Sequence, residues 1–220
     1  MLQPGSQYKT RSGQVRIISS LGKGKSGYSH LVRNGQNKMV LKIMHDEENP
    51  FYSFGDDKLG PELRAYEILN GLDINLPRLL EYDRDRNYLL KRYIDGEVAG
   101  NVIAGGKIND EVLIFLFEMS ETLTRKGFNI DYFPMNFVIT PDNRLFYIDY
   151  EINPYSDEWN LLNWGIYYWI NRKGMEAFLR TGDATFINEN IDKGKPFKNG
   201  FDKEIKRLAD KFKRTKGPSK

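Results

Sequence analysis

The stretch that decides the fold of this chain is GFNIDYFPMNFVITPDNRLFYIDYE, residues 127–151. Two short apolar runs in it, Phe137–Ile139 and Leu145–Ile148, flank the polar turn Pro141–Arg144 and predict a two-strand hairpin. Side chains with oxygen atoms stand before, at the start of and after this hairpin, namely Asp131, Asn136 and Asp149. Carboxylate and amide oxygens suit Mg²⁺, and a loop carboxylate can orient a hydroxyl. Side chains of this kind can hold Mg²⁺ on a nucleotide and orient an attacking hydroxyl, and the preceding part of the chain decides whether this set does so.

The composition is that of an ordinary globular protein with 220 residues, of which 40% are hydrophobic and 29% are charged. This length allows one sizeable core or two small lobes. Cysteine is absent, which excludes disulfides and cysteine metal sites, and the two histidines, His30 and His45, make a histidine metal centre or a Ser-His-Asp triad unexpected. The first residues, MLQPGSQYKTRSG, lack the apolar core of a signal peptide, and no run reaches membrane-spanning length. We expect a cytoplasmic location and no membrane-spanning segment.

A glycine motif follows the first strand pattern. Residues 14–18 alternate as a strand does and lead into LGKGKSG, residues 21–27, which fits G-x-G-x-x-G. Glycines let backbone amides approach phosphates because no Cβ stands in the way. A Walker P-loop is excluded because Ser19 stands where the first glycine is required. A dinucleotide fingerprint needs a helix next, but Tyr28–Val32 reads as a strand. The motif therefore predicts a strand, a glycine loop and a second strand.

Lys42 lies inside the otherwise apolar strand Met39–Met44. An unpaired ammonium there is costly, so Lys42 is either an edge lysine with its head in water or the partner of an acid and a phosphate. Pro61–Leu69 has the pattern of a helix and offers two acids, Glu62 and Glu67. We favour Glu62, near the start of the helix, although a solvated acid is also favoured at that position by the helix dipole.

The remaining pattern places strands first and helices later. Strands over Arg78–Tyr82 and Asn87–Tyr93 complete a lobe of five strands and one helix, and Ala99–Gly106 reads as a glycine-rich connection. Asn109 can cap a helix that runs from Asp110 to about Lys126. The core face of that helix is predicted to carry Val112, Phe115, Leu116, Met119 and Leu123.

The C-terminal segment is basic. Residues 203–220 carry a net charge of +6, which leaves −3 for the rest of the chain. Apolar residues recur there at helical spacing, namely Phe201, Ile205, Leu208 and Phe212. This spacing predicts a docked terminal helix with a solvated basic face, and weak contact with nucleic acid or a membrane through the basic tail is the second interpretation.

Taken in chain order, these elements resemble the protein-kinase-like superfamily. The matching elements are the glycine loop with Gly22, Gly24 and Gly27, then Val40-Leu41-Lys42, the helical Glu62, Asp131 with Asn136, and Ile148-Asp149-Tyr150-Glu151. The resemblance implies a two-lobed α+β fold with ATP between the lobes. The N-lobe, residues 1–95, would be an antiparallel sheet with one helix, and the C-lobe, residues 96–220, would be mainly helical.

The resemblance also assigns roles in binding ATP and Mg²⁺ and in phosphoryl transfer. The expected nucleotide-binding residues are Gly22, Gly24 and Gly27 over the phosphates, Lys42 paired with Glu62, and Arg92 and Ile94 at a hinge near residues 92–96. The expected catalytic residues are Lys42 and Asp131, of which Asp131 orients the acceptor hydroxyl, and the expected Mg²⁺ ligands are Asn136 and Asp149. Taken singly, Asp131, Asn136 and Asp149 also fit polar loop and turn residues.

Several departures from regulated protein kinases narrow the expected function. Asn129-Ile130-Asp131 replaces His-Arg-Asp, and Phe133 stands where many protein kinases place a lysine. Tyr150-Glu151 replaces Phe-Gly, as in aminoglycoside and choline kinase-like enzymes. Only Ile152–Ser156 separates Glu151 from the next helix-like run, which leaves no room for an activation segment.

That next run, residues 157–166, begins with Asp157 and Trp159, which resemble the Asp-x-Trp that braces the catalytic loop in this superfamily. A helix N-terminus followed by core aromatics is the equal alternative. The shortened plan is similar to compact RIO-type and KEOPS-complex kinases and to small-molecule phosphotransferases. We expect an ATP- and Mg²⁺-dependent kinase that favours protein Ser/Thr slightly over a small metabolite, and the alternative class is a pseudokinase that binds nucleotide or acts as a scaffold.

Overall fold

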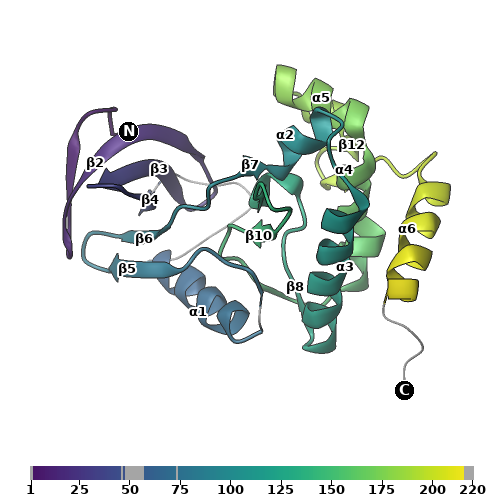
Figure 1. Cartoon of the computed structure of the whole chain (residues 1–220), viewed down its shortest axis with the longest axis horizontal. Helices are drawn as coiled ribbons and strands as arrows, with labels where there is room; N and C mark the ends of the chain where they lie inside the picture. The colour runs from purple at the N-terminus through teal and green to yellow at the C-terminus, as the bar shows by residue number, and fades with distance from the viewer. Residues whose placement is uncertain (1, 46, 48–56, 73, 216–220) are drawn as a thin grey trace. The chain divides into compact units, whose positions relative to one another are not determined.

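The computed structural model describes residues 2–45, 47, 57–72 and 74–215, with the side chains of the last three of these left out. The chain divides into two compact units (Figure 1). The first unit comprises Met1–Asn70 and Leu76–Ile94, and the second comprises Gly71–Asn75 and Asp95–Lys220.

The first unit is built on a six-stranded antiparallel sheet with the order β1-β2-β3-β4-β6-β5 (Figure 1). Its strands are β1 Gln7–Thr10, β2 Gly13–Lys23, β3 Gly27–Asn34, β4 Asn37–Met44, β5 Leu79–Asp83 and β6 Tyr88–Arg92. Alternating apolar side chains of these strands form one buried cluster, which includes Val15, Ile17, Val32, Leu41 and Leu90. The predicted strands of this unit are confirmed, and β1 is an additional strand that the sequence pattern does not predict.

The glycine motif forms the predicted hairpin. Strand β2 ends at Lys23, β3 begins at Gly27, and the Gly24 amide donates to the Gly27 carbonyl at 2.8 Å. A Cβ on Gly27 would lie 2.6 Å from the Ile43 carbonyl oxygen, so only glycine lets β3 approach β4 this closely. Gly22 has φ +141°, a conformation that side-chain-bearing residues rarely adopt.

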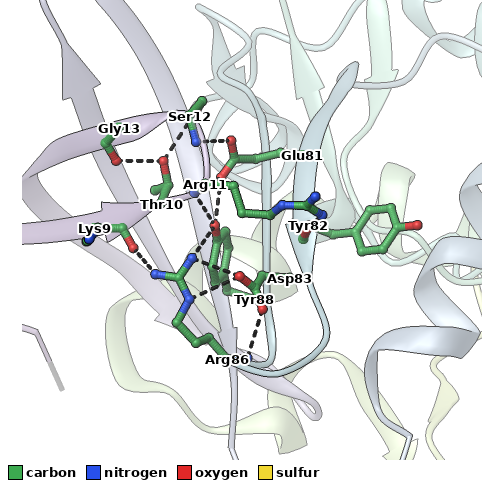
Figure 2. A network of polar contacts seen from close by, with 10 residues as sticks. All are labelled: Lys9, Thr10, Arg11, Ser12, Gly13, Glu81, Tyr82, Asp83, Arg86 and Tyr88. Carbon is green, nitrogen blue, oxygen red and sulfur yellow. Dashed lines mark hydrogen bonds and ion pairs between the residues drawn. The ribbon is translucent and has the colours of Figure 1, made fainter.

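The turn between β1 and β2 is bonded to β5 at the other edge of the sheet (Figure 2). Glu81 accepts hydrogen bonds from the Arg11 amide at 3.0 Å and from the Ser12 amide at 3.0 Å. The buried Tyr88 hydroxyl donates to Glu81 at 2.7 Å, and burial followed by this carboxylate raises the pKa of Tyr88 to about 12. Arg86 packs over the Tyr88 ring and bonds the Lys9 carbonyl. Together these contacts join the two edges of the curled sheet.

Helix α1, Leu59–Asn70, is the one helix predicted for this unit and lies between β4 and β5 in the chain. Asp57 caps its start by accepting from the Gly60 amide at 2.7 Å. Leu63 and Leu69 are buried on its core side, and so is the acid Glu62. The helix therefore brings a carboxylate into the interior of the first unit.

The second unit is mainly helical. Its α-helices are α2 Ala99–Ala104, α3 Asp110–Arg125, α4 Ile166–Ile170, α5 Arg172–Thr181 and α6 Asp202–Thr215. Its strands are β7 Glu97–Val98, β8 Phe128–Asn129, β9 Phe137–Ile139, β10 Leu145–Tyr147, β11 Asn153–Pro154, β12 Asn188–Asn190 and β13 Lys195–Pro196. The predicted hairpin is confirmed as β9–β10, and β7 adds a third strand beside β9.

Helix α3 begins where the sequence predicts. Asn109 accepts from the Val112 amide at 3.0 Å, and Gly127 follows the helix with φ +77°. Four of the five predicted core residues of α3 are buried, but Phe115 is 36% exposed. The prediction for Phe115 is wrong because the helix also packs on a side where Phe117 stacks against Phe212 of α6 at 5.2 Å. The buried stripe is therefore turned toward a second neighbour.

Helix α6 is docked on α3, which confirms the interpretation of the basic tail as a docked helix. Leu208 is 3% exposed, and Arg207 bonds both oxygens of Asp110 at 2.9 Å. Lys211 reaches the same carboxylate at 2.7 Å. Two of the basic side chains thus bind within the chain, and residues 216–220 of the tail lie outside the described residues.

Two local predictions in the second unit are wrong. The expected glycine-rich connection contains α2, where Gly100 serves packing because a Cβ there would lie 2.5 Å from Met135 Sδ. The expected single helix after residue 156 is broken into a 3-10 turn at Asp157–Trp159, a π turn at Leu161–Gly165 and α4. Across the part of the chain that the structure describes, we find no helix with the length and apolar character needed to cross a membrane.

Candidate functional site

Lys42 and Glu62 form a buried ion pair in the first unit. The Lys42 Nζ–Glu62 Oε1 distance is 2.5 Å, and the two residues are each 7% exposed. Of the two acids that the sequence offered, Glu62 is therefore the one that meets the lysine, and the edge-lysine alternative does not hold. The other oxygen, Glu62 Oε2, is buried and has no hydrogen-bond partner among the described residues. The pair thus keeps one polar atom whose hydrogen-bonding capacity no described residue uses.

The pair lies next to the base of the glycine hairpin. Lys42 on β4 is paired in register with Ser29, two residues after Gly27 on β3. Near the tip of the hairpin, a Cβ on Gly22 would meet no atom of the described residues within 4 Å, and a Cβ on Gly24 would meet among them only the Gly27 carbonyl oxygen, at 3.6 Å. The glycines therefore leave their backbone open to a close approach by phosphate as far as the described residues go, and a cation stands at the base of the hairpin.

The second unit brings together Asp131, Asn136 and Asp149, the three side chains singled out in residues 127–151. Asp131 Oδ1 accepts from the Phe133 amide at 3.0 Å, and the Asn136 side chain donates to the Asp131 carbonyl at 3.4 Å. The Ile148 amide donates to the Asn136 carbonyl at 2.9 Å, so the chain enters Asp149 directly beside this loop. Asp149 Oδ1 accepts from the amide of Tyr150 at 3.0 Å. Backbone amides thus fix the direction of both carboxylates.

The buried Tyr147 reports that negative charge gathers at this point. Burial raises the pKa of the Tyr147 hydroxyl well above its ordinary value, and the charges of Asp149, Asp131 and Glu151 raise it further. The hydroxyl donates to the Glu151 carbonyl at 3.1 Å and stays protonated. Asp131, Asp149 and Glu151 are therefore near enough to act electrostatically on the same buried hydroxyl.

The loop that carries Asp131 is fixed from behind by α4. Trp169, which is fully buried, donates through its indole N–H to the Tyr132 carbonyl at 2.8 Å. Gly165 allows this approach, because a Cβ there would lie 2.4 Å from Tyr132 Cβ. The buried Asn129 donates to the Ser156 carbonyl at 2.8 Å from the other end of the loop. No local sequence pattern indicates these supports, because they join residues far apart in the chain.

Asp157 and Trp159 do not brace the loop as the resemblance suggested. Asp157 is exposed and accepts from the Tyr155 hydroxyl at 2.7 Å. Trp159 is 38% exposed and lies under the ammonium of Lys195 at 3.8 Å. The alternative of core aromatics is also wrong for Trp159, and the bracing contacts come from Asn129 and Trp169.

Phe133 is held by other aromatic rings. Its ring makes edge contacts with Tyr168 at 5.2 Å and with Phe178 at 6.0 Å. Tyr168 in turn donates to the Asn188 side chain at 2.6 Å, and burial followed by the charge of Asp131 raises the pKa of Tyr168. An apolar side chain therefore occupies the loop position for which the resemblance expects a lysine.

Arg92 and Ile94, the residues assigned to the hinge, lie at the end of the first unit. The Arg92 side chain is exposed and its amide donates to the Arg78 carbonyl at 2.8 Å, while Ile94 is half-buried. Neither side chain contacts Lys42 or Glu62 in any contact that the structure describes, and their assignment to ATP binding stays a prediction.

Sequence reasoning missed one polar residue at the lysine. Ser26, inside the glycine loop, is 6% exposed and donates to Glu62 Oε1 at 2.6 Å. It stands at a variable position of G-x-G-x-x-G, so nothing in the motif marked it.

A divalent cation fits the second unit when the protein supplies only part of its coordination shell. No group of three His, Cys, Asp or Glu side chains that could hold a metal by itself occurs within the described ranges. Mg²⁺ is usually bound by one or two carboxylates together with substrate phosphates and water rather than by a complete protein cage. Asp149 with the amide oxygen of Asn136 provides a donor set of this kind.

Comparison with known proteins gives structural likeness without sequence matches. No protein-family model matches the chain, and no curated protein sequence matches it. Among solved structures, the PknI kinase domain of Mycobacterium tuberculosis is similar at 16% identity and a TM-score of 0.43, over 68% of this chain and 62% of that one. Vaccinia related kinase 3 is similar at 13% identity and a TM-score of 0.45, over 70% of this chain and 53% of that one. The chain thus spans less than two thirds of either protein.

The expected architecture is found in the elements themselves. Within the described residues, the first unit has the antiparallel sheet, the glycine hairpin and one helix between β4 and β5, and the second is mainly helical with a loop and hairpin. The predicted α+β fold class is therefore confirmed.

Proposed function

We propose that the chain is an ATP- and Mg²⁺-dependent phosphotransferase that acts on a hydroxyl group. The favoured acceptor is a Ser or Thr side chain of a protein, and the alternative acceptor is a small molecule. The observation that carries the proposal is the buried Lys42–Glu62 pair at the base of the glycine hairpin. A buried ion pair contributes little net stability because desolvation offsets the attraction between the charges. A chemical role for the lysine, such as holding phosphates, accounts better for its presence.

Each unit supplies distinct parts of the proposed reaction. In the first unit, the backbone around Gly22, Gly24 and Gly27 covers the phosphates and Lys42 neutralises them, held in direction by Glu62. MgATP supplies the phosphoryl group that is transferred. In the second unit, Asp131 accepts a hydrogen bond from the acceptor hydroxyl and orients it, and Asn136 and Asp149 provide the protein ligands for Mg²⁺.

The short connection after Glu151 supports a compact kinase without an activation segment. Asn153 and Pro154 form β11, which pairs with β8, and the chain then enters the 3-10 turn at Asp157. These residues are fixed by strand pairing, so they do not provide a loop that phosphorylation could order. We therefore propose that the activity does not depend on phosphorylation of such a segment.

Phe133 supports a second candidate, a nucleotide-binding module that transfers no phosphate. Its packing against Tyr168 and Phe178 places an apolar ring where a lysine would neutralise the transferred group. The first experiment, a thermal melt with and without MgATP, tests the nucleotide binding that both candidates share. Specific binding raises the melting temperature. No shift at saturating nucleotide contradicts both candidates.

Transfer is then measured with γ-³²P-labelled ATP, on the protein itself and on pools of Ser/Thr peptides and hydroxylated metabolites. Loss of a general base typically costs about 10²–10⁴-fold in rate, and we expect this loss for Asp131→Asn. Asp142→Asn is the matched control, because Asp142 is an exposed residue of the β9–β10 turn. Nucleotide binding without transfer in the wild type selects the second candidate. Equal transfer by the two variants removes Asp131 from the mechanism.

A further inference from the structure

The serine of the glycine loop is attached to the ion pair beneath it. Ser26 is 6% exposed, although it belongs to a loop whose other residues from Lys23 to Lys25 are exposed. Its hydroxyl donates to Glu62 Oε1 at 2.6 Å, and the same oxygen accepts from Lys42 at 2.5 Å. One carboxylate oxygen therefore joins the loop, the helix α1 and the strand β4.

The backbone of Ser26 is fixed as well. Its carbonyl accepts from the His45 amide at 3.1 Å, just beyond the end of β4, and the Gly24 amide closes the turn onto Gly27 at 2.8 Å. Gly27 lies so close to β4 that a Cβ there would collide with it. Moving this side of the hairpin away from β4 would therefore break close contacts. The Ser26 hydroxyl thus extends from a stem that is already anchored.

The second oxygen of Glu62 shows why the serine matters. Glu62 Oε2 has no hydrogen-bond partner among the described residues, so the direction of the carboxylate depends on the bonds at Oε1. Hydrogen bonds that involve an ionised group are stronger and shorter than neutral ones. The Ser26 hydroxyl holds Glu62 Oε1 in place, and this is the same oxygen that accepts from Lys42 and sets its direction.

We propose that Ser26 is a positioning residue, which couples the glycine loop to the Lys42–Glu62 pair by fixing the Glu62 carboxylate. This proposal rests on the proposed function where it concerns nucleotide, but the coupling itself is a property of the ligand-free protein. In the coupled state, Lys42 points in one direction while the loop is held at its base. The serine hydroxyl therefore aligns the two phosphate-binding parts of the first unit before nucleotide arrives.

The test uses the full chain with Ser26→Ala, the conservative variant Ser26→Thr, and Ser20→Ala as the matched control. Ser20 lies on β2, is exposed, and makes no side-chain hydrogen bond within the described part of the chain. The first readout is nucleotide-free. NMR-detected exchange of the Gly24 and His45 amides is expected to accelerate in Ser26→Ala and to stay unchanged in Ser20→Ala.

The second readout is the dissociation constant of a fluorescent ATP analogue. Loss of a hydrogen bond to a charged group corresponds to about tenfold weaker binding, which we expect for Ser26→Ala, with most of the affinity kept by Ser26→Thr. In a Glu62→Met background, the same Ser26→Ala change is expected to have less than about a twofold effect, because a residue that acts through Glu62 loses its target. A merely structural serine would weaken binding equally in both backgrounds.

The outcomes separate this proposal from the proposed function. If the wild type binds nucleotide and Ser26→Ala binds within twofold of it, the coupling is overturned while the kinase proposal stands. If the wild type does not bind nucleotide, the kinase proposal fails and amide exchange decides. Unchanged exchange in Ser26→Ala then overturns the coupling, and faster exchange confined to the Gly24 and His45 amides and their neighbours supports it.

Discussion

Two glutamates of the first unit use their oxygens differently. Glu81 has both oxygens bonded, one to Tyr88 and the Arg11 amide and the other to the Ser12 amide (Figure 2). Glu62 has two donors on one oxygen and no hydrogen-bond partner for the other among the described residues. The first carboxylate completes a network that joins the edges of a sheet. The second stays incomplete beside the glycine hairpin.

The difference separates a structural network from a candidate functional one. Buried polar atoms are nearly always bonded, and an unsatisfied one costs stability. A protein that leaves a carboxylate oxygen unbonded beside a buried lysine keeps a charged group available at a stability cost. The satisfied network around Glu81 needs no such explanation. The comparison therefore predicts that disrupting either network lowers stability, and that disrupting the network at Glu62 also lowers the affinity for nucleotide.

The largest effect is expected for Lys42→Met. Removal of one partner of a buried pair leaves an uncompensated charge on Glu62, and we expect a loss of about 3 kcal/mol in the free energy of unfolding. The double variant Lys42→Met/Glu62→Leu should recover most of that loss, because it removes both charges. Urea denaturation measures both. Neither variant should show the thermal shift with MgATP, and a shift retained by the double variant would contradict the role of Lys42.

A smaller loss is expected for Glu81→Ala. The amides of Arg11 and Ser12 and the Tyr88 hydroxyl lose their acceptor, which we expect to cost about 2 kcal/mol in the free energy of unfolding. Affinity for the fluorescent ATP analogue should stay within twofold of the wild type at a temperature where the variant is folded. Glu81→Gln keeps an acceptor oxygen and should recover part of the stability. A large loss of nucleotide affinity in Glu81→Ala would remove the distinction between the two networks.

Asp110 extends the comparison to a satisfied carboxylate near the surface. Its pKa is held well below the ordinary value, mainly by the hydrogen bonds from Arg207 and then by the one from Lys211. Since the pKa is lower in the folded state, this stabilisation is complete above the pKa of the unfolded chain and is lost as pH falls through the folded value. We expect Asp110→Ala to cost about 1 kcal/mol because exposed ion pairs contribute little.

Hydrogen exchange measures the local consequence of this change. Amides of α6 should exchange faster in Asp110→Ala, and Asp210→Ala is the control because Asp210 is exposed on the same helix and bonds to no described side chain. Unchanged exchange in α6 would mean that Leu208 and Phe212 hold the helix without the ion pairs.

The smallest effect concerns His30, a second buried residue with an unbonded atom. His30 is 1% exposed, its Nδ1 lacks a hydrogen-bond partner in the described part of the chain, and burial lowers its pKa. The unfolded chain therefore binds a proton more readily, and the free energy of unfolding falls as pH drops through about 6.5, the ordinary pKa of histidine. Denaturation of wild type and His30→Leu between pH 8 and 5.5 measures the difference. Parallel pH profiles would show that an unbonded atom alone has no such consequence.

The sequence predicted what local patterns specify. The glycine hairpin, the Asn109 cap and the β9–β10 hairpin each depend on residues close together in the chain. Lys42 could be placed beside an acid because a charge in an apolar strand requires a partner.

What the sequence did not predict depends on contacts between distant residues. β1 has the polar sequence QYKT and is a strand because β2 pairs with it. The glycines of residues 99–106 indicate a connection, whereas Gly100 lies in α2 and makes room for Met135. Ser26 was missed for the same reason, since its role depends on a glutamate 36 residues away.

The closure of the sheet at Glu81 also constrains the order of folding. Its hydrogen bonds join Arg11 and Ser12 to residues about 70 positions later in the chain. Contacts of such long range carry a large loop-closure entropy and form after local hairpins. During synthesis, the hydrogen bonds of the β1–β2 turn to Glu81 therefore cannot form until β5 and β6 have been synthesised. We expect the closed sheet to form in the last folding step of the first unit.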